Sequence, residues 1–313
     1  MYRYQRILVE TPEEGVAMPA LAYHRALWIH QMDELGEKTI EEAAKTALTD
    51  AAADTILLKA FDQLKYMATY DTAPDAVSSV SKWQQLASRA EAVGVTLIPW
   101  VVPGNHTQAQ THAILAPSPI VVDLEPYTQF WTDTAGAVAE YITTLREGDV
   151  SEIYVSIDPR NPQVAQLDVA SWAHLVDGLV PQMYWPEFQQ PEGAVIPRLD
   201  AAIAGLGVPV YPAYSYDASG PDLATAWADA LGYGVTGCSL FRMGVANAQQ
   251  LQAFATLQLP AKPAPPAQAW TNNDLVQIER LLLGESVTNY QPDIVGAISY
   301  LRRFQSAAVS ARV

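Results

Sequence analysis

Two carboxylates, Asp123 and Glu125, stand one residue apart at the end of the apolar run 119–122. An unbroken run of Ile and Val predicts a strand buried on both faces, as in a parallel sheet. Residues i and i+2 of a strand share a face and lie roughly 6.6 Å apart along it, so both acids should project together. Such neighbours push their pKa values apart, and one then holds a proton near neutral pH. The pattern favours general acid catalysis. The alternatives are a solvated strand end and an acid pair that caps the next helix.

The acidic stretch is one of eight strand-like runs that alternate with helical segments. The expected strands are residues 26–31, 55–61, 95–102, 119–127, 152–157, 176–185, 208–214 and 234–241. The expected helices are 39–53, 75–93, 132–146, 164–175, 194–206, 221–232 and 247–257. This alternation predicts an α/β fold, a (β/α)8 TIM barrel. A seven-stranded or partly open barrel is the alternative, because the unit between the third and fourth strands has the weakest pattern.

Polar and aromatic side chains gather at or just beyond the carboxyl ends of the expected strands. They are His30, Asp62, Trp100, Asp123, Glu125, Asp158, Gln182, Tyr184 and Tyr214. Barrel enzymes build their sites at this end of the strands, whereas a purely structural pattern would scatter such residues between both ends.

Two short motifs resemble elements of TIM-barrel glycoside hydrolases of the chitinase and lysozyme-like type. Those enzymes end the fourth strand in Asp-x-Glu and line the sixth with Met-x-Tyr or Gln-x-Tyr, and this chain has Asp123-Leu124-Glu125 and Gln182-Met183-Tyr184. The resemblance covers the barrel and not residues 260–313. Family-18 chitinases carry further acids in the fourth strand, where this chain has Ser118 and Val121, and family-25 lysozymes have an Asp at the end of strand one, where it has His30. The chain looks like a divergent relative.

The resemblance implies roles for four residues. Glu125 would be the general acid that protonates the leaving oxygen, and Asp123 would orient a substrate acetamido group or raise the pKa of that acid. Tyr184 and Gln182 would donate hydrogen bonds to the sugar or to the developing charge.

Aromatic and acidic residues complete the candidate substrate-binding set. Trp100, Trp185 and Tyr214 would offer flat faces for sugar stacking, although aromatics at strand ends also serve as lids of the core. Asp62 and Asp158 are the acidic members. Asp158-Pro159-Arg160 is either a substrate clamp or an internal ion pair that fixes a loop, and the ion pair is the favoured interpretation.

Composition excludes several classes of function. A net charge of −16 over 313 residues argues against nucleic acid and anionic membranes as partners. The five histidines show no ligand spacing and the single cysteine, Cys238, lies in an apolar run, so we expect no metal, no cofactor and a buried thiol. No apolar run reaches the length of a membrane span, and residues 1–10 lack the apolar segment of a secretory signal. The sequence predicts a soluble protein that would need another carrier to act outside a cell.

The chain is expected to fall into three parts. Residues 1–258 would form the barrel with its lead-in, 259–269 a proline-rich linker, and 270–313 a tail with helices at 272–283 and 293–311. So small a tail cannot bury a good core alone. It would pack on the barrel as a brace, on a copy of itself, or on a larger assembly.

These observations favour a glycoside hydrolase that cleaves a cell-wall or other N-acetylated polysaccharide. The alternative from another class is a non-catalytic barrel that binds glycans or serves in an extracellular or virion-like assembly. The missing accessory acids and the helical tail keep that alternative open. A metal- or phosphate-dependent barrel enzyme ranks third, because the glycines in 216–220 and 242–244 form no phosphate cradle.

Overall fold

The computed structural model describes residues 19–36, 38–115, 119–189 and 206–262. Eight parallel strands form a closed ring in the order β1-β9-β8-β7-β6-β5-β4-β2, and β1 pairs with β2 to complete it. Their bounds are β1 Arg25–Ile29, β2 Thr55–Asp62, β4 Thr96–Val102, β5 Ile120–Leu124, β6 Ile153–Ile157, β7 Gly178–Met183, β8 Ala213–Ser215 and β9 Cys238–Phe241. A two-residue strand, β3 (Lys65–Tyr66), pairs with the end of β2 in the antiparallel sense. The predicted (β/α)8 barrel is therefore confirmed, and each expected strand overlaps an observed one.

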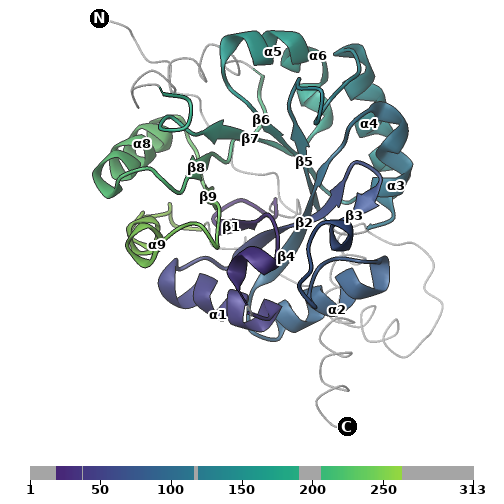
Figure 1. The fold of residues 1–313 in the computed structure, drawn as a ribbon. Coiled ribbons are helices and arrows are strands. Elements are labelled where there is room, and N and C mark those ends of the chain that lie inside the picture. The colour runs from purple at the N-terminus through teal and green to yellow at the C-terminus, as the bar shows by residue number, and fades with distance from the viewer. Residues whose placement is uncertain (1–18, 37, 116–118, 190–205, 263–313) are drawn as a thin grey trace, which may run out of the picture. The chain divides into compact units, whose positions relative to one another are not determined.

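The helices lie around the outside of the ring of strands (Figure 1). They are α1 Ile40–Asp50, α2 Val80–Glu91, α3 Ala109–Ala113, α4 Gly136–Glu147, α5 Asn161–Leu167, α6 Val169–Trp172, α8 Gly220–Gly232 and α9 Ala248–Ala255. Short 3-10 turns accompany them in the described part of the chain: η1 Asp33–Leu35, η2 Met67–Thr69, η3 His106–Gln108 and η4 Ala173–Leu175. The expected helices at 194–206, 272–283 and 293–311 fall outside the described residues. None of the described helices has the length and hydropathy needed to cross a membrane.

Two expected elements differ from the structure. The helix expected at 164–175 is divided into α5, α6 and η4, because Asp168 adopts the left-handed conformation with φ of 46°. The strand expected at 208–214 is reduced to β8 and one isolated bridge from Val210 to Leu179. Pro209 and Pro212 interrupt that strand because proline has no N–H to donate to a ladder.

Alternation along the strands separates two hydrophobic layers. One large cluster, which includes Ile56, Leu58 and Val122, fills the space between the strands and the helices. A second cluster takes buried side chains from different strands, including Leu57 and Val121, and these meet across the barrel axis. Successive residues of a strand therefore serve opposite layers, which fixes the side chains that can reach an axial cavity.

The amino ends of the strands are covered by the turn that precedes β1. Ala20 N–H donates to Glu152 Oε2 over 2.7 Å, and Leu21 N–H donates to the Tyr154 hydroxyl over 3.3 Å. Gly237 must be glycine here, because a Cβ atom at that position would lie 2.1 Å from the Leu21 carbonyl oxygen. The turn closes this end of the barrel and leaves the carboxyl ends for a site.

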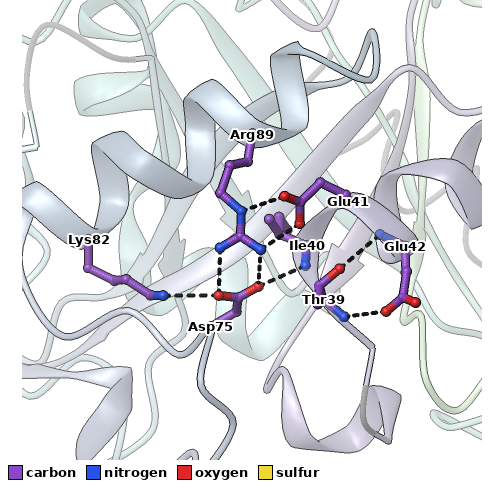
Figure 2. A network of polar contacts seen from close by, with 7 residues as sticks. All are labelled: Thr39, Ile40, Glu41, Glu42, Asp75, Lys82 and Arg89. Atoms are coloured by element: carbon purple, nitrogen blue, oxygen red, sulfur yellow. Dashed lines mark hydrogen bonds and ion pairs between the residues drawn. The ribbon is translucent and has the colours of Figure 1, made fainter.

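A network of charged groups joins α1 to α2 (Figure 2). Asp75 accepts hydrogen bonds from Ile40 N–H at 3.0 Å, from Lys82 at 2.9 Å and from Arg89 at 2.8 and 2.9 Å. Arg89 also donates to both carboxylate oxygens of Glu41, at 2.6 and 2.5 Å. Thr39 and Glu42 form the capping box that begins α1. Burial alone would raise the pKa of Asp75, but hydrogen bonds from Arg89, Ile40 and Lys82 outweigh it and lower the pKa to about 2.

Candidate functional site

A cavity of about 320 Å³ opens among the carboxyl ends of the strands. It is lined by Trp28, His30, Lys59, Trp100, Asp123, Glu125, Phe130, Ser156, Gln182, Tyr184, Glu187, Phe188, Phe241 and Arg242. Most of the barrel strands contribute a residue from their inner face or from the position just beyond their end. The cavity thus lies at the strand ends where the sequence predicts a site, and it has the concave, partly aromatic lining of a ligand pocket.

Asp123 and Glu125 meet at one amide group in this cavity. The Gln182 side-chain nitrogen lies 3.1 Å from Asp123 Oδ1 and 2.6 Å from Glu125 Oε1, and 3.3 Å from the Ser156 hydroxyl. Asp123 is the last but one residue of β5 and is only 7% exposed. The two acids therefore share a face, as the i, i+2 spacing requires, and β7 supplies their common donor.

Both carboxyl groups have raised pKa values. Burial raises the pKa of Asp123, and hydrogen bonds from Ser156 and Gln182 together with the charge of Lys59 oppose the rise. Burial also raises the pKa of Glu125, to which the neighbouring charge of Asp123 adds. Because the charge of Asp123 adds to burial at Glu125, the two carboxyl groups together hold a proton near neutral pH. A buried acid that is protonated at this pH is equipped to donate a proton.

Tyr184 belongs to an aromatic wall of the cavity. Its ring stacks on Phe241 with centroids 5.4 Å apart and an interplanar angle of 23°, and it lies 5.8 Å from Phe188. Burial, followed by the charges of Asp123 and Glu125, raises the pKa of Tyr184 well above its usual value. The hydroxyl group therefore remains a hydrogen-bond donor at any physiological pH.

Trp100 is another aromatic residue of the lining. Its indole N–H donates to the Ile29 carbonyl oxygen over 3.1 Å, and its ring meets Trp28 edge to face at 5.3 Å. The Trp28 indole N–H is bound to the Ser239 hydroxyl at 2.9 Å. With both indole nitrogens satisfied inside the protein, the rings present carbon faces and edges to the cavity.

The structure does not bring Trp185 and Tyr214 to the cavity. Their rings pack edge to face at 6.0 Å within the layer between strands and helices. The reason is alternation, since Gln182 and Tyr184 point inward and the next residue, Trp185, must point outward. Tyr214 likewise follows the inward-facing Ala213. Both aromatics belong to the core, which was the alternative considered for them.

The two acidic candidates Asp62 and Asp158 lie beside the cavity rather than in its lining. Asp158 is fully buried and forms an ion pair with Arg160, and it accepts a hydrogen bond of 2.9 Å from the Tyr127 hydroxyl. The favoured ion-pair interpretation of this triplet agrees with that geometry. Asp62 accepts a hydrogen bond of 2.9 Å from Lys59.

Sequence reasoning missed several lining residues, and one of them carried a signal. Lys59 is the charged residue within the otherwise apolar run of β2, and a charge in a buried strand needs a partner or a function. The others named only by the structure are Trp28, Phe130, Ser156, Glu187, Phe188, Phe241 and Arg242. Most of these lie in loops or on strand faces whose register the sequence leaves open.

The buried thiol of Cys238 behaves as expected, because Cys238 is buried and burial raises its pKa to about 12. Among residues 19–262, as far as they are described, no group of three His, Cys, Asp or Glu side chains could hold a metal ion.

The ring of parallel strands, the surrounding helices and the cavity at the carboxyl ends define a (β/α)8 barrel. No protein-family model matches the chain, and no curated protein matches it. Solved structures do. The glycoside hydrolase family 18 N-acetylglucosaminidase from Paenibacillus barengoltzii aligns with a TM-score of 0.53 and 10% identity, over 74% of this chain and 99% of that one.

Two further structures have the same TM-score of 0.53. The PgaB (BpsB) glycoside hydrolase domain from Bordetella bronchiseptica is 11% identical and covers 75% of this chain and 99% of its own. A xylanase-A-amylase inhibitor protein is 10% identical and covers 76% of this chain and 99% of its own. At such low identity these similarities establish the fold alone.

Proposed function

We propose that this protein is a glycoside hydrolase whose general acid is Glu125. One observation carries the proposal: the two strand-end carboxyl groups meet at Gln182 inside the cavity, where burial and the charge of Asp123 raise the pKa of Glu125. The cavity then contains a buried proton donor beside an anion, which is the division of roles that glycoside hydrolysis requires.

In the proposed reaction Glu125 donates its proton to the glycosidic oxygen as the bond to the sugar carbon breaks. A water molecule then adds to that carbon and gives its proton back to Glu125. Asp123, as the anion, accepts a hydrogen bond from the N–H of a substrate acetamido group and stabilises the positive charge that develops on the sugar. Gln182 holds the two carboxyl groups in register. The Tyr184 hydroxyl, which stays protonated, is available to donate to a sugar oxygen.

The substrate class we propose is an N-acetylated or other cell-wall polysaccharide. The Asp-x-Glu and Gln-x-Tyr resemblance supports the acetamido group, and the lining supports a sugar. Trp100, Tyr184 and Phe241 give the lining the aromatic character that is common in sugar-binding sites.

A second candidate function is a non-catalytic glycan-binding barrel. Val121 favours it, because this residue lies in the axial cluster at a position where family-18 chitinases carry an acid. The similarity to an inhibitor protein with the same fold is compatible with this alternative.

The test is hydrolysis of end-labelled chito-oligosaccharides and cell-wall fragments by wild type and by Glu125→Gln. The variant keeps shape and hydrogen bonding but has no proton to transfer, so we expect hydrolysis to fall about 10²- to 10⁴-fold. Binding, measured by calorimetry, should persist because the aromatic faces are unchanged. Glu140→Gln, an exposed change on α4, is the matched control.

Two results would contradict the proposal. Equal hydrolysis by wild type and Glu125→Gln would remove Glu125 from the mechanism. Tight oligosaccharide binding by a wild type that hydrolyses none of the substrates would favour the non-catalytic barrel.

A further inference from the structure

Lys59 is a cation inside the barrel. It is 5% exposed, it lines the cavity, and it lies opposite Trp100 in the β2–β4 register. Its ammonium nitrogen is 5.0 Å from the centroid of the Trp100 ring. Burial at this depth costs stability, because the ammonium charge loses its hydration unless neighbouring groups replace it. The groups around it must offset that cost.

A bulge in β2 supplies one of those groups. The pairing of β2 with β4 shifts register between Lys59 and Phe61, and Ala60 and Phe61 both pack in the outer layer. In a regular strand residues i and i+3 point to opposite faces. The extra residue of the bulge returns Asp62 to the side of Lys59, where its carboxylate accepts the hydrogen bond of 2.9 Å.

Asp123 is the second group that the ammonium charge affects. Lys59 pairs with Trp100, and Trp100 pairs with Val121. Asp123 is the next residue of β5 on the same face as Val121, and it lines the same cavity as Lys59. The charge of Lys59 lowers the pKa of Asp123 against the larger effect of burial. The same charge, after burial, lowers the pKa of His30, whose ring nitrogen lies 3.2 Å from Glu34. His30 is therefore neutral and does not compete as a cation.

The remaining charges near the pair are engaged with partners of their own or lie at other parts of the lining. They are Arg160 with Asp158, Arg242 with Glu34, Glu187 and the Tyr184 hydroxyl. Asp158 raises the pKa of Glu125 and Arg160, with the smaller effect, lowers it.

We propose that Lys59 is a positioning residue of the site: its ammonium group keeps Asp123 ionised and thereby leaves the proton of the pair on Glu125. The negative charge of Asp123 then opposes ionisation of Glu125. The ammonium group of Lys59 thus makes Asp123 the anion and Glu125 the proton donor of the pair. The catalytic meaning of this arrangement rests on the proposed function, whereas the location of the proton does not.

The first test measures the proton directly. Infrared difference spectra record the protonated-carboxyl band of each acid against pH, assigned with Asp123→Asn and Glu125→Gln. In Lys59→Met we expect the midpoint of Asp123 to rise by about one pH unit, the low end for removal of a nearby opposite charge. Lys59→Arg should restore it. Lys45→Met, which removes an exposed lysine of α1, should leave it unchanged.

The second test uses hydrolysis. If Asp123 must be ionised, the acid limb of the pH–rate profile of Lys59→Met should move upward by the same interval, and Lys59→Arg should return it. Asp62→Asn provides a second test in case Lys59→Met does not fold. This variant keeps the ammonium charge of Lys59, so the Asp123 midpoint should be no higher than in wild type.

An Asp123 midpoint that does not move in Lys59→Met, or that rises equally in Lys45→Met, would overturn the inference. These outcomes are separable from those of the proposed function. A wild type without hydrolytic activity still gives the infrared midpoints, and Glu125-dependent hydrolysis with an unmoved midpoint rejects only the role of Lys59.

Discussion

At the scale of single residues, the main feature of the site is that its two acids have few polar partners. Asp123 and Glu125 are buried with Gln182 as their common donor, and none of the ion pairs between described residues includes either acid. A pair placed for stability alone would carry an arginine, as Asp158 does with Arg160. The cavity instead holds two buried acids without an arginine partner. This arrangement costs stability, and it is typical of catalytic groups.

That cost should appear in the pH dependence of unfolding. Burial and Asp123 raise the pKa of Glu125 to about 8 in the folded state, against an ordinary value near 4.5 when unfolded. The folded protein therefore binds the extra proton between these values, and the associated stability is full below the lower value and is lost as pH rises through the higher one. We expect the free energy of unfolding to fall by up to about 1.4 kcal/mol per pH unit in this window.

Thermal melts of wild type and Glu125→Gln from pH 4.5 to 9 measure this effect. The glutamine variant lacks the titrating group. Its melting temperature minus that of wild type should therefore increase as the pH rises. A difference that stays constant across the range would mean that Glu125 is ionised in the folded protein at neutral pH.

At the scale of elements, the strands position the side chains of the site that the sequence predicts, whereas the loops contribute lining residues that the sequence does not predict. The alternation of β5 and β7 is enough to place Asp123, Glu125, Gln182 and Tyr184 on inner faces, and the sequence predicts this correctly. The same alternation places Trp185 and Tyr214 on outer faces. Applying it requires knowing which residue of each strand faces inward. Strand ends and the proline-interrupted β8 leave that choice open in the sequence.

The bulge in β2 explains why Lys59 escaped prediction. A bulge depends on the register between two strands that are distant in sequence, so no local pattern specifies it. Phe130 and Phe188 escaped prediction for a related reason, because loop residues reach the cavity only through tertiary packing.

The network between α1 and α2 has its own consequence for stability. Arg89→Met removes the donor shared by Asp75 and Glu41 and leaves Asp75 with Lys82 and the Ile40 N–H. We expect a loss of about 1–2 kcal/mol at pH 7, toward the low end for charged hydrogen bonds because Arg89 is about a third exposed. Urea unfolding measures the loss, with Lys45→Met as the control.

The sign of the pH effect is opposite to that of Glu125. The folded-state pKa of Asp75 is lowered to about 2, so its contribution is present above pH 4 and is lost as pH falls through 2. The gap between wild type and Arg89→Met should therefore close on acidification from pH 4 to 2. A gap that persists unchanged at pH 2 would assign the loss to packing of the arginine side chain instead.

At the scale of the whole molecule, the barrel is closed by contacts that end shortly after α9. The Trp227 indole N–H donates to the Gln258 carbonyl oxygen over 2.9 Å, and Arg25 donates to the carbonyl oxygen of Leu257. Leu257 is buried and Leu259 packs against the outer hydrophobic layer. The chain of described contacts thus reaches residue 259, at the start of the expected linker.

We therefore predict that a chain ending after Ala261 folds into the same barrel, because it keeps every contact just described and loses only proline-rich and tail residues. Its melt should stay cooperative, and its melting temperature should lie within a few degrees of that of the full chain, as expected when about 1 kcal/mol or less is at stake. A chain ending after Thr256 is the matched control. It removes Leu257, the Gln258 acceptor and Leu259, and should melt at a clearly lower temperature. Circular dichroism and calorimetry measure both. If the chain ending after Ala261 is insoluble or melts without cooperativity, residues 262–313 are part of the folding unit and the division of the chain at the linker is wrong.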